Sequence, residues 1–214
     1  MNKSKLSAFS LAVFAVIVLD QISKYVIRTT PTLHNYQIIE GWLAFHYTQN
    51  PGMALGISWA DTWIISLIAI VATVVIIVFI FKTMQSATIG YMICMGLIIG
   101  GALGNIIDRL FMARIENYGT FLDGHVVDFI HFTLTINGFR IFPYIFNIAD
   151  AAISVSIFTL ILFYKQLMPE ASQGKEPGNE GGNEAQQEEK REQNHQQEKP
   201  RIDPPEGSHR EKES

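Results

Sequence analysis

Residues 62–81 read TWIISLIAIVATVVIIVFIF, a run of 20 residues without a charged side chain. At about 1.5 Å per residue, a helix of this length crosses the ~30 Å hydrocarbon core of a bilayer. Lys82 follows the run directly and marks a polar boundary. The stretch therefore predicts a transmembrane helix and places the chain among integral membrane proteins.

Three further apolar runs flank this helix. The first begins after Lys3 and Lys5, but it continues through Asp20 and no small-x-small cleavage site follows, which argues against a removable signal peptide. The predicted spans are residues 6–27, 62–81, 87–107 and 148–164. The sequence thus predicts an all-α membrane protein built as a four-transmembrane-helix bundle.

The third predicted span carries glycine at every fourth position, at Gly96, Gly100 and Gly104. Residues four apart lie on one face of a helix, and glycine there lets a neighbouring helix come close. The alternative explanation is that glycine is simply common in membrane helices. We expect a closely packed helix along this face.

The connections at residues 28–61 and 108–147 are long and rich in aromatic and β-branched residues. In the second connection, Asn137-Gly138 separates two short apolar segments, a pattern typical of a β-hairpin with a type I′ turn. Open strands leave backbone groups unpaired and do not cross lipid. We therefore expect a small β-sheet and hairpin region at the membrane surface.

Residues 166–214 differ in composition from the rest of the chain. They contain seven basic and twelve acidic residues and no Phe, Tyr or Trp, whereas residues 1–165 contain nine basic and eight acidic residues. Such a segment cannot bury enough apolar surface to offset its ordering entropy, so we predict a disordered Glu/Gln-rich tail. The acidity belongs to this tail, and nothing in the charge indicates a nucleic-acid partner.

Polar residues of the predicted spans occur at three places. With four spans, the end of the first, the end of the third and the start of the fourth lie at the same membrane face. The residues are Asp20, Gln21 and Lys24 in the first span, Asn105, Asp108 and Arg109 in the third, and Asn147, Asp150 and Ser154 in the fourth. Spacings of three and four residues put the members of each set on one side of a helix. We expect one polar site inside the bundle near one membrane surface.

Asp150 stands at the start of a hydrophobic span, where an ionised group is costly unless it faces a polar cavity or a partner. Asp128 precedes it by 22 residues, enough for a hairpin to bring the two carboxylates together. Two close carboxylates in a partly dry site share a proton and titrate as a pair, which is the aspartic-protease arrangement. We expect Asp128 to lie on a mobile loop and Asp150 to be its fixed partner.

Other classes of function remain open on these residues alone. Buried carboxylates also relay charge in small proton- or ion-coupled transport proteins, although the second span has no charge to continue a pathway. A non-catalytic scaffold leaves Asp150 unexplained, and ordinary interfacial carboxylates are a further alternative. The histidines His34, His46, His125 and His131 are scattered through the connections, so we expect neither a metal site nor a cofactor.

Five short motifs follow one another along about residues 8–165. They are Asp20-Gln-Ile-Ser-Lys24, Asn50-Pro-Gly52-Met-Ala54, Gly100-Gly-Ala-Leu-Gly-Asn-Ile-Ile-Asp108-Arg109, Val126-Val-Asp128-Phe and Phe142-Pro-Tyr-Ile-Phe-Asn147-Ile-Ala-Asp150. In this order the sequence resembles the bacterial lipoprotein signal peptidases (signal peptidase II), a family of intramembrane aspartic proteases.

The resemblance implies that Asp128 and Asp150 are the catalytic pair of a peptidase domain at residues 1–165. It implies a diacylglyceryl-modified prolipoprotein substrate, cut before its lipidated cysteine, and binding of cyclic peptide inhibitors such as globomycin. The site would lie near the outer leaflet of the bacterial cytoplasmic (inner) membrane, with extracytoplasmic connections and both termini in the cytoplasm, and we expect a monomer. The residues implied to bind or support are Asn50, Gly52, Asn105, Asp108, Arg109 and Asn147, with Asp20 and Lys24 stabilising the bundle.

The sequence departs from the family pattern in places. Met53 and Leu55 stand where the family more often has a small residue and Phe. Residues 110–125 form a longer link than usual, where we expect a flexible lid, and the tail has no counterpart in the family core.

The distribution of basic residues does not by itself give the orientation. Close to the predicted spans, five lysines and arginines lie on each side: Lys3, Lys5, Lys82, Lys165 and Lys175 on the side of the termini, and Lys24, Arg28, Arg109, Arg114 and Arg140 on the other. If Lys24 and Arg109 are paired within the polar site, the remaining excess favours cytoplasmic termini.

Overall fold

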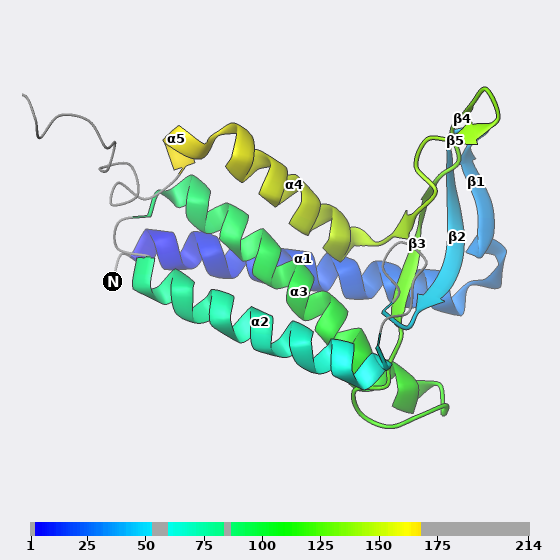
Figure 1. Cartoon of the computed structure of the whole chain (residues 1–214), viewed down its shortest axis with the longest axis horizontal. Helices are drawn as coiled ribbons and strands as arrows, with labels where there is room; N and C mark the ends of the chain where they lie inside the picture. The colour runs from blue at the N-terminus through cyan, green and yellow to red at the C-terminus, as the bar shows by residue number, and fades with distance from the viewer. Residues whose placement is uncertain (1–2, 53–59, 84–86, 168–214) are drawn as a thin grey trace, which may run out of the picture. The chain divides into compact units, whose positions relative to one another are not determined.

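The computed structural model describes residues 3–52, 60–83 and 87–167 (Figure 1). The predicted disordered tail lies outside the described residues from residue 168 on, as do Met53 and Leu55. The elements are α1 (Lys3–Thr29), η1 (Pro31–Leu33), β1 (Asn35–Ile39), β2 (Leu43–Asn50), α2 (Thr62–Thr83), α3 (Ile89–Ile115), β3 (Val126–Phe132), β4 (Thr135–Ile136), β5 (Phe139–Arg140), β6 (Ile145–Phe146), α4 (Ile148–Leu162) and α5 (Tyr164–Leu167).

The four long helices coincide with the four predicted apolar runs. Helices α1, α2 and α3 are long and apolar enough to cross a membrane. Helix α4 has 15 residues, about 22 Å of helix, and is shorter than a typical span. The described residues therefore contain three candidate membrane helices, where the sequence predicted four.

Helix α3 extends about two turns beyond the predicted end at residue 107. The prediction ended the helix where Asp108 and Arg109 interrupt the apolar run. The added turns bury Met112 and Ala113 against the rest of the protein, which stabilises the continued helix, while Phe111 and Ile115 on them stay exposed. The predicted connection at residues 108–147 thus begins inside a helix.

The glycine face of α3 packs closely against α1, as predicted. A Cβ atom at Gly96 would lie 2.8 Å from the Cβ of Ala12, and one at Gly100 would lie 2.9 Å from the Cβ of Val16. Both distances are too short for real Cβ contacts, so larger residues would push the helices apart. The glycines therefore set the spacing between α1 and α3.

Four strands form an antiparallel sheet in the order β1-β2-β3-β6, which lies at one end of the helix bundle, beside the last turns of α1 (Figure 1). Strand β2 pairs with β3 so that Thr48 lies opposite Asp128. Strands β4 and β5 form a separate hairpin, in which Asn137 has φ 51° and Gly138 has φ 80°. Positive φ at both positions is the requirement of a type I′ turn, so the predicted hairpin is confirmed.

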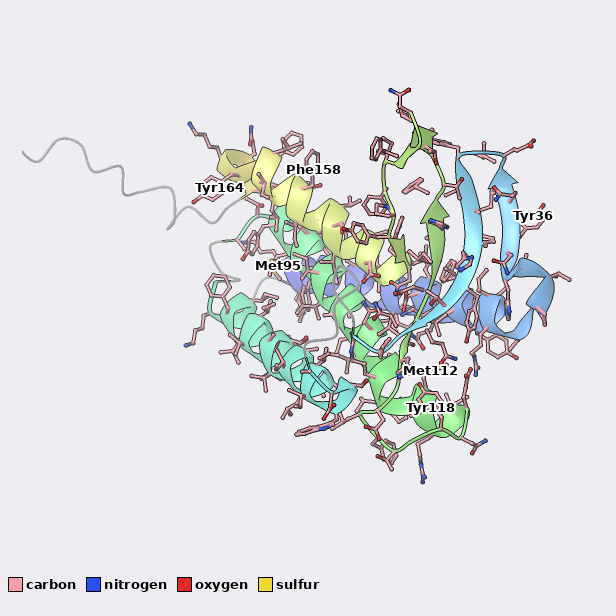
Figure 2. The ribbon with its side chains drawn as sticks, turned by 45° about the vertical axis from the view of Figure 1, so that its right-hand side comes forward. Tyr36, Met95, Met112, Tyr118, Phe158 and Tyr164 are labelled. Atoms are coloured by element: carbon pink, nitrogen blue, oxygen red, sulfur yellow. The ribbon has the colours of Figure 1, made fainter. Side chains whose placement is uncertain are left out.

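Two clusters of buried apolar side chains pack around α3, one before and one after its polar residues along the helix. Figure 2 labels one member of each on this helix, Met95 and Met112. The first cluster contains Ile80, Ala87, Tyr91, Met92, Met95 and Ile99. The second contains Ile27, Met112, Val127 and Phe129, and it joins the sheet to α1 and α3. The polar site is thus held between two packed apolar layers.

Candidate active site

Asp128 lies within strand β3 and is 3% exposed. The Nδ2 groups of Asn50 and Asn147 donate to its two carboxylate oxygens at 3.1 and 2.7 Å. The neighbouring side chains of Val127 and Phe129 anchor the strand in the second apolar cluster. The expectation of a mobile loop is therefore wrong, because pairing with β2 and β6 and this packing fix the strand.

Asp150 lies in the first turn of α4 and takes part in the cap that begins the helix. Asn147 Oδ1 accepts a hydrogen bond from the Asp150 amide at 2.9 Å, and Asp150 Oδ2 accepts one from the Asn147 amide at 3.3 Å. This capping box satisfies two N–H groups at the helix start, where a carboxylate is also favoured by the helix dipole. The cap therefore fixes the position of Asp150. Its side chain is only half-buried, so part of it stays accessible.

The amides of Asn105 and Asn147 connect the two carboxylates. Asn147 Nδ2 donates to Asp128, whereas Asn105 Nδ2 donates to Asp150 Oδ1 at 2.8 Å. Asn105 Oδ1 accepts from Asn147 Nδ2 at 3.1 Å and from Lys24 Nζ at 3.0 Å. Because two donors hold the oxygen of Asn105, its NH₂ group is directed at Asp150. Residues from α1, α3, β3 and α4 thus bring the pair together.

Asn50 is held by a turn of its own chain. Its Oδ1 accepts from the Gly52 amide at 2.8 Å while its Nδ2 donates to Asp128. Gly52 has φ 110°, a conformation that residues with a side chain rarely adopt. The glycine therefore allows the turn that fixes the Asn50 amide.

Burial raises the pKa of Asp128 to about 7, and the nearby charge of Asp150 acts in the same direction. The amide donors Asn50 and Asn147 favour the ionised form and oppose this shift. Within the described part of the chain, neither Asp128 nor Asp150 forms an ion pair. A carboxyl group with such a pKa exchanges its proton near neutral pH, as a pair with a shared proton requires.

A second polar cluster lies next to this pair. Lys24 is 3% exposed, and its Nζ lies 2.8 Å from both Asp20 Oδ2 and Asp108 Oδ2. Asp20 Oδ1 accepts from the Ala149 amide at 3.0 Å, and Asp108 Oδ2 accepts from the Val127 amide at 3.1 Å. The cluster therefore ties α1 and α3 to the first turn of α4 and to β3, which are the segments that carry Asp150 and Asp128.

Arg109 faces the pair from α3. Its guanidinium interacts electrostatically with both Asp128 and Asp150, and its Nη1 donates to the Asn105 carbonyl at 3.4 Å. Its buried Nε has no hydrogen-bond partner among the described residues. Arg109 thus offers a cationic donor beside the two carboxylates.

The site therefore contains two carboxylates, amide donors and one cation. No three His, Cys, Asp or Glu side chains form a candidate metal site in residues 3–52, 60–83 and 87–167. One ionised and one protonated carboxylate can activate water and polarise a carbonyl group. The arrangement is chemically suited to hydrolysis by general acid–base catalysis.

The ten residues that the sequence analysis assigned to the site all lie in this connected region. Ser154, which belonged to the predicted polar set, is instead exposed on α4. Gln21, which also belonged to the predicted polar set, does reach the site, because its Nε2 lies 3.2 Å from Asp20 Oδ2 and 3.1 Å from Asp108 Oδ1. One contribution was missed, the Val127 backbone amide, because a backbone donor leaves no signal in the sequence.

Comparison with known proteins matches the family model of signal peptidase (SPase) II to residues 12–166. A lipoprotein signal peptidase of Porphyromonas gingivalis is 30% identical, and the alignment covers 75% of this chain and 84% of that protein. One from Chlorobium phaeobacteroides is 33% identical, with 75% of this chain and 91% of that protein covered.

The chain is also similar to solved structures. A bacterial membrane enzyme is similar with a TM-score of 0.59 and 29% identity, over 81% of this chain and 95% of that one. A second has a TM-score of 0.58 and 28% identity, over 75% and 94% of the two chains.

Proposed function

The chain belongs to the signal peptidase II family, and on that premise we propose that Asp128 and Asp150 are the pair with which it removes signal peptides from diacylglyceryl-modified prolipoproteins. The match of the family model to residues 12–166 is the observation that supports the peptidase function. The assignment of the pair is supported by Asn147, which bonds to both carboxylates. Cleavage takes place before the lipidated cysteine.

In the proposed reaction, the two carboxylates share one proton. The ionised member takes a proton from water, whose oxygen attacks the scissile carbonyl, while the protonated member hydrogen-bonds to the carbonyl oxygen. The proton taken from water then goes to the leaving amine as the peptide bond breaks. Asn50, Asn105 and Asn147 orient the carboxylates, and Arg109 contacts the substrate backbone. Asp20, Lys24 and Asp108 keep the supporting helices in place.

We place four helices across the membrane, with α4 as the fourth. Only Phe163 separates α4 from α5, so Ile148–Leu167 provides 20 residues, about 30 Å of near-continuous helix. Four crossings put both termini on one side. Lys24 is buried in ion pairs, and Arg109 faces the carboxylates, so neither acts as a free loop charge; this supports cytoplasmic termini. Cysteine-accessibility labelling at Gly41 and Lys82 would test the orientation, because only Gly41 should react from outside.

The site then lies near the outer leaflet of the bacterial cytoplasmic membrane, with the sheet and hairpin at its surface. The exposed apolar side chains of the sheet and hairpin support this placement. They include Tyr36, Trp42, Ile136, Phe139, Phe142 and Tyr144, and Figure 2 shows Tyr36 pointing away from the helices. Aromatic side chains of this kind are favoured at membrane–water interfaces.

The proposal extends to ligands and assembly. A lipid-anchored substrate would reach the pair from the membrane, and cyclic peptide inhibitors such as globomycin would compete with it there. We propose that the enzyme acts as a monomer and without a cofactor. The relatives reported above are lipoprotein signal peptidases, which favours this function over a proton- or ion-coupled transport protein.

The deciding experiment replaces Asp128 or Asp150 with Asn and follows cleavage of a lipidated prolipoprotein. Each variant should lose at least about 10³-fold in kcat, because the pair can no longer hold one shared proton between two carboxylates. Asp61→Asn, an exposed carboxylate at the start of α2, is the matched control. Full cleavage activity in either Asp128→Asn or Asp150→Asn would refute the assignment of the pair. Proton flux through the reconstituted protein would instead favour a transport function.

A further inference from the structure

Glu116 lies at the C-terminal end of α3, inside the link at residues 110–125. Its backbone N–H caps the helix by donating to the Met112 carbonyl at 2.9 Å. Its carboxylate accepts from Gln49 Nε2 at 2.6 Å and from Arg28 Nη1 at 3.4 Å. Gln49 Nε2 also lies 2.8 Å from the Tyr47 hydroxyl. Glu116 therefore joins the end of α3 to strand β2.

The residue bonded to Glu116 directly precedes Asn50. Strand β2 has an irregular register between Phe45 and Thr48, so its last residues, 48–50, form a separate short ladder with β3. Irregularities of this kind redirect the side chains that follow them. The orientation of Asn50 is therefore not fixed by the first part of β2, and the Gln49–Glu116 hydrogen bond supplies a second support.

Asp128 and Asp150 are thus both connected to α3 through hydrogen bonds. Asn105 on this helix bonds to Asp150, and Glu116 lies 11 residues further along, which is about three turns and nearly the same face. Through Gln49 and Asn50, Glu116 is connected to Asp128. One rigid helix therefore supports the two halves of the site at two points.

The loop after Glu116 is held in place and does not depend on this contact. Thr120 donates to Asp123 Oδ2 from its amide at 3.0 Å and from its hydroxyl at 2.7 Å. Ser66 Oγ on α2 donates to the Leu122 carbonyl at 2.8 Å. These bonds argue against the flexible lid expected from the sequence. They also provide a control residue, Asp123, in the same loop.

From these contacts we propose that Glu116 is a positioning residue that acts through Gln49 to keep the Asn50 amide aligned on Asp128. The inference rests on the proposed function, because it concerns the geometry of the same pair. Glu116 acts as a hydrogen-bond acceptor, and its charge is not the essential property. A glutamine at this position still offers an oxygen to Gln49, whereas an alanine does not.

The test compares Glu116→Ala, Glu116→Gln, Gln49→Leu and the double variant Glu116→Ala/Gln49→Leu in the prolipoprotein cleavage assay. Glu116→Ala and Gln49→Leu should each lower kcat about 10-fold with little change in KM, because a small misalignment of a catalytic group is costly. The double variant should lose no more than either single variant, because both remove one interaction. Glu116→Gln should retain wild-type kcat.

The pH profile distinguishes alignment from a merely structural role. The Asn50 amide favours ionised Asp128, so its misalignment should move the alkaline limb of kcat to higher pH in Glu116→Ala and Gln49→Leu. Glu116→Gln and the control Asp123→Ala should keep the wild-type limb. If Glu116→Ala does not fold, as judged by thermal unfolding in detergent, Gln49→Leu and Glu116→Gln carry the same test.

Three outcomes would overturn the inference: wild-type kcat and pH profile in both Glu116→Ala and Gln49→Leu, equal losses in Glu116→Ala and Glu116→Gln, or additive losses in the double variant. Asp128→Asn in the same assay separates the two proposals. If Asp128→Asn is inactive while Glu116→Ala is normal, only the positioning role fails. If Asp128→Asn is fully active, the proposed function fails.

Discussion

Two groups of carboxylates lie side by side in this bundle, and they differ in what holds them. Asp20 and Asp108 share the ammonium group of Lys24, at 2.8 Å from each. Asp128 and Asp150 are instead held by the neutral amides of three asparagines. A cation balances the charge of the carboxylates beside it, whereas an amide orients a carboxylate without balancing its charge.

One bundle thus provides both a rigid ion-paired group and a reactive pair. Asn105 touches both groups, since its oxygen accepts from Lys24 and its NH₂ donates to Asp150. The ion-paired group thus orients the amide-held group without neutralising it. Changes on each side of Asn105 should therefore have different consequences.

Lys24→Met removes the cation and leaves two carboxylates buried without a counter-charge. We expect the free energy of unfolding to fall by about 3–5 kcal/mol, measured by denaturant unfolding in detergent. Lys82→Met is the control, because Lys82 is exposed at the end of α2. If Lys24→Met and Lys82→Met lowered the free energy of unfolding equally, the ion pairs of Lys24 would not be what makes the Asp20–Asp108 group rigid.

Asn147→Ser separates helix capping from support of the pair. Serine still caps the helix but cannot reach Asp128, so we expect kcat to fall about 10²-fold while stability changes by less than about 1 kcal/mol. Asn147→Ala removes both functions and should lose about 1 kcal/mol more in stability. Cleavage rates and unfolding of the two variants provide the measurement. A serine variant with full activity would show that the amide bridge is dispensable.

The raised pKa of Asp128 should make the stability of the fold depend on pH. The folded chain holds this proton up to about pH 7, whereas the ordinary pKa is 3.8. Between these values the folded state binds more protons, so the Asp128 contribution to stability falls as the pH rises, by up to about 1.4 kcal/mol per pH unit. The difference in unfolding free energy between wild type and Asp128→Asn should show this slope. A flat difference between about pH 5 and 7 would contradict the raised pKa.

The ion pair Arg28–Glu116 is partly exposed and can be compared with the buried ion pairs of Lys24. Its side chains are 21% and 27% exposed and its atoms lie 3.4 Å apart. Arg28→Gln should therefore change the unfolding free energy by less than about 1 kcal/mol. It should also leave kcat unchanged, since Gln49 still reaches Glu116. A loss comparable to that of Lys24→Met would show that burial does not decide the strength of these pairs.

Much of the candidate site could be predicted because the period of the helix determines which residues, by their spacing in the sequence, lie on the same helix face. Asp20 and Lys24 are four residues apart and Asn147 and Asp150 three, so each pair shares a helix face whatever the rest of the chain does. The predicted hairpin was equally local, since Asn137-Gly138 alone selects its turn.

The errors concern contacts between distant parts of the chain. Asp128 is in a strand because β2 and β6 pair with β3, and α3 continues past Asp108 because the sheet covers Met112. The Gln49–Glu116 hydrogen bond joins residues 67 positions apart. No local pattern in the sequence signals such a contact. Whether α4 counts as a span depends on the position of the bilayer as well as on the length of the helix.

The cap of α4 has a consequence for protein design. The turn Asn147–Asp150 begins a helix, fixes one carboxylate and presents an amide to a second, all within four residues. Moving Asp150 by one position would rotate it by about 100° around the helix and remove the cap at the same time. The start of the helix and the position of the carboxylate are therefore coupled within one turn. A designed membrane hydrolase that copies this turn would also need a neighbouring strand with a second acid, and amide donors in the places of Asn50 and Asn105.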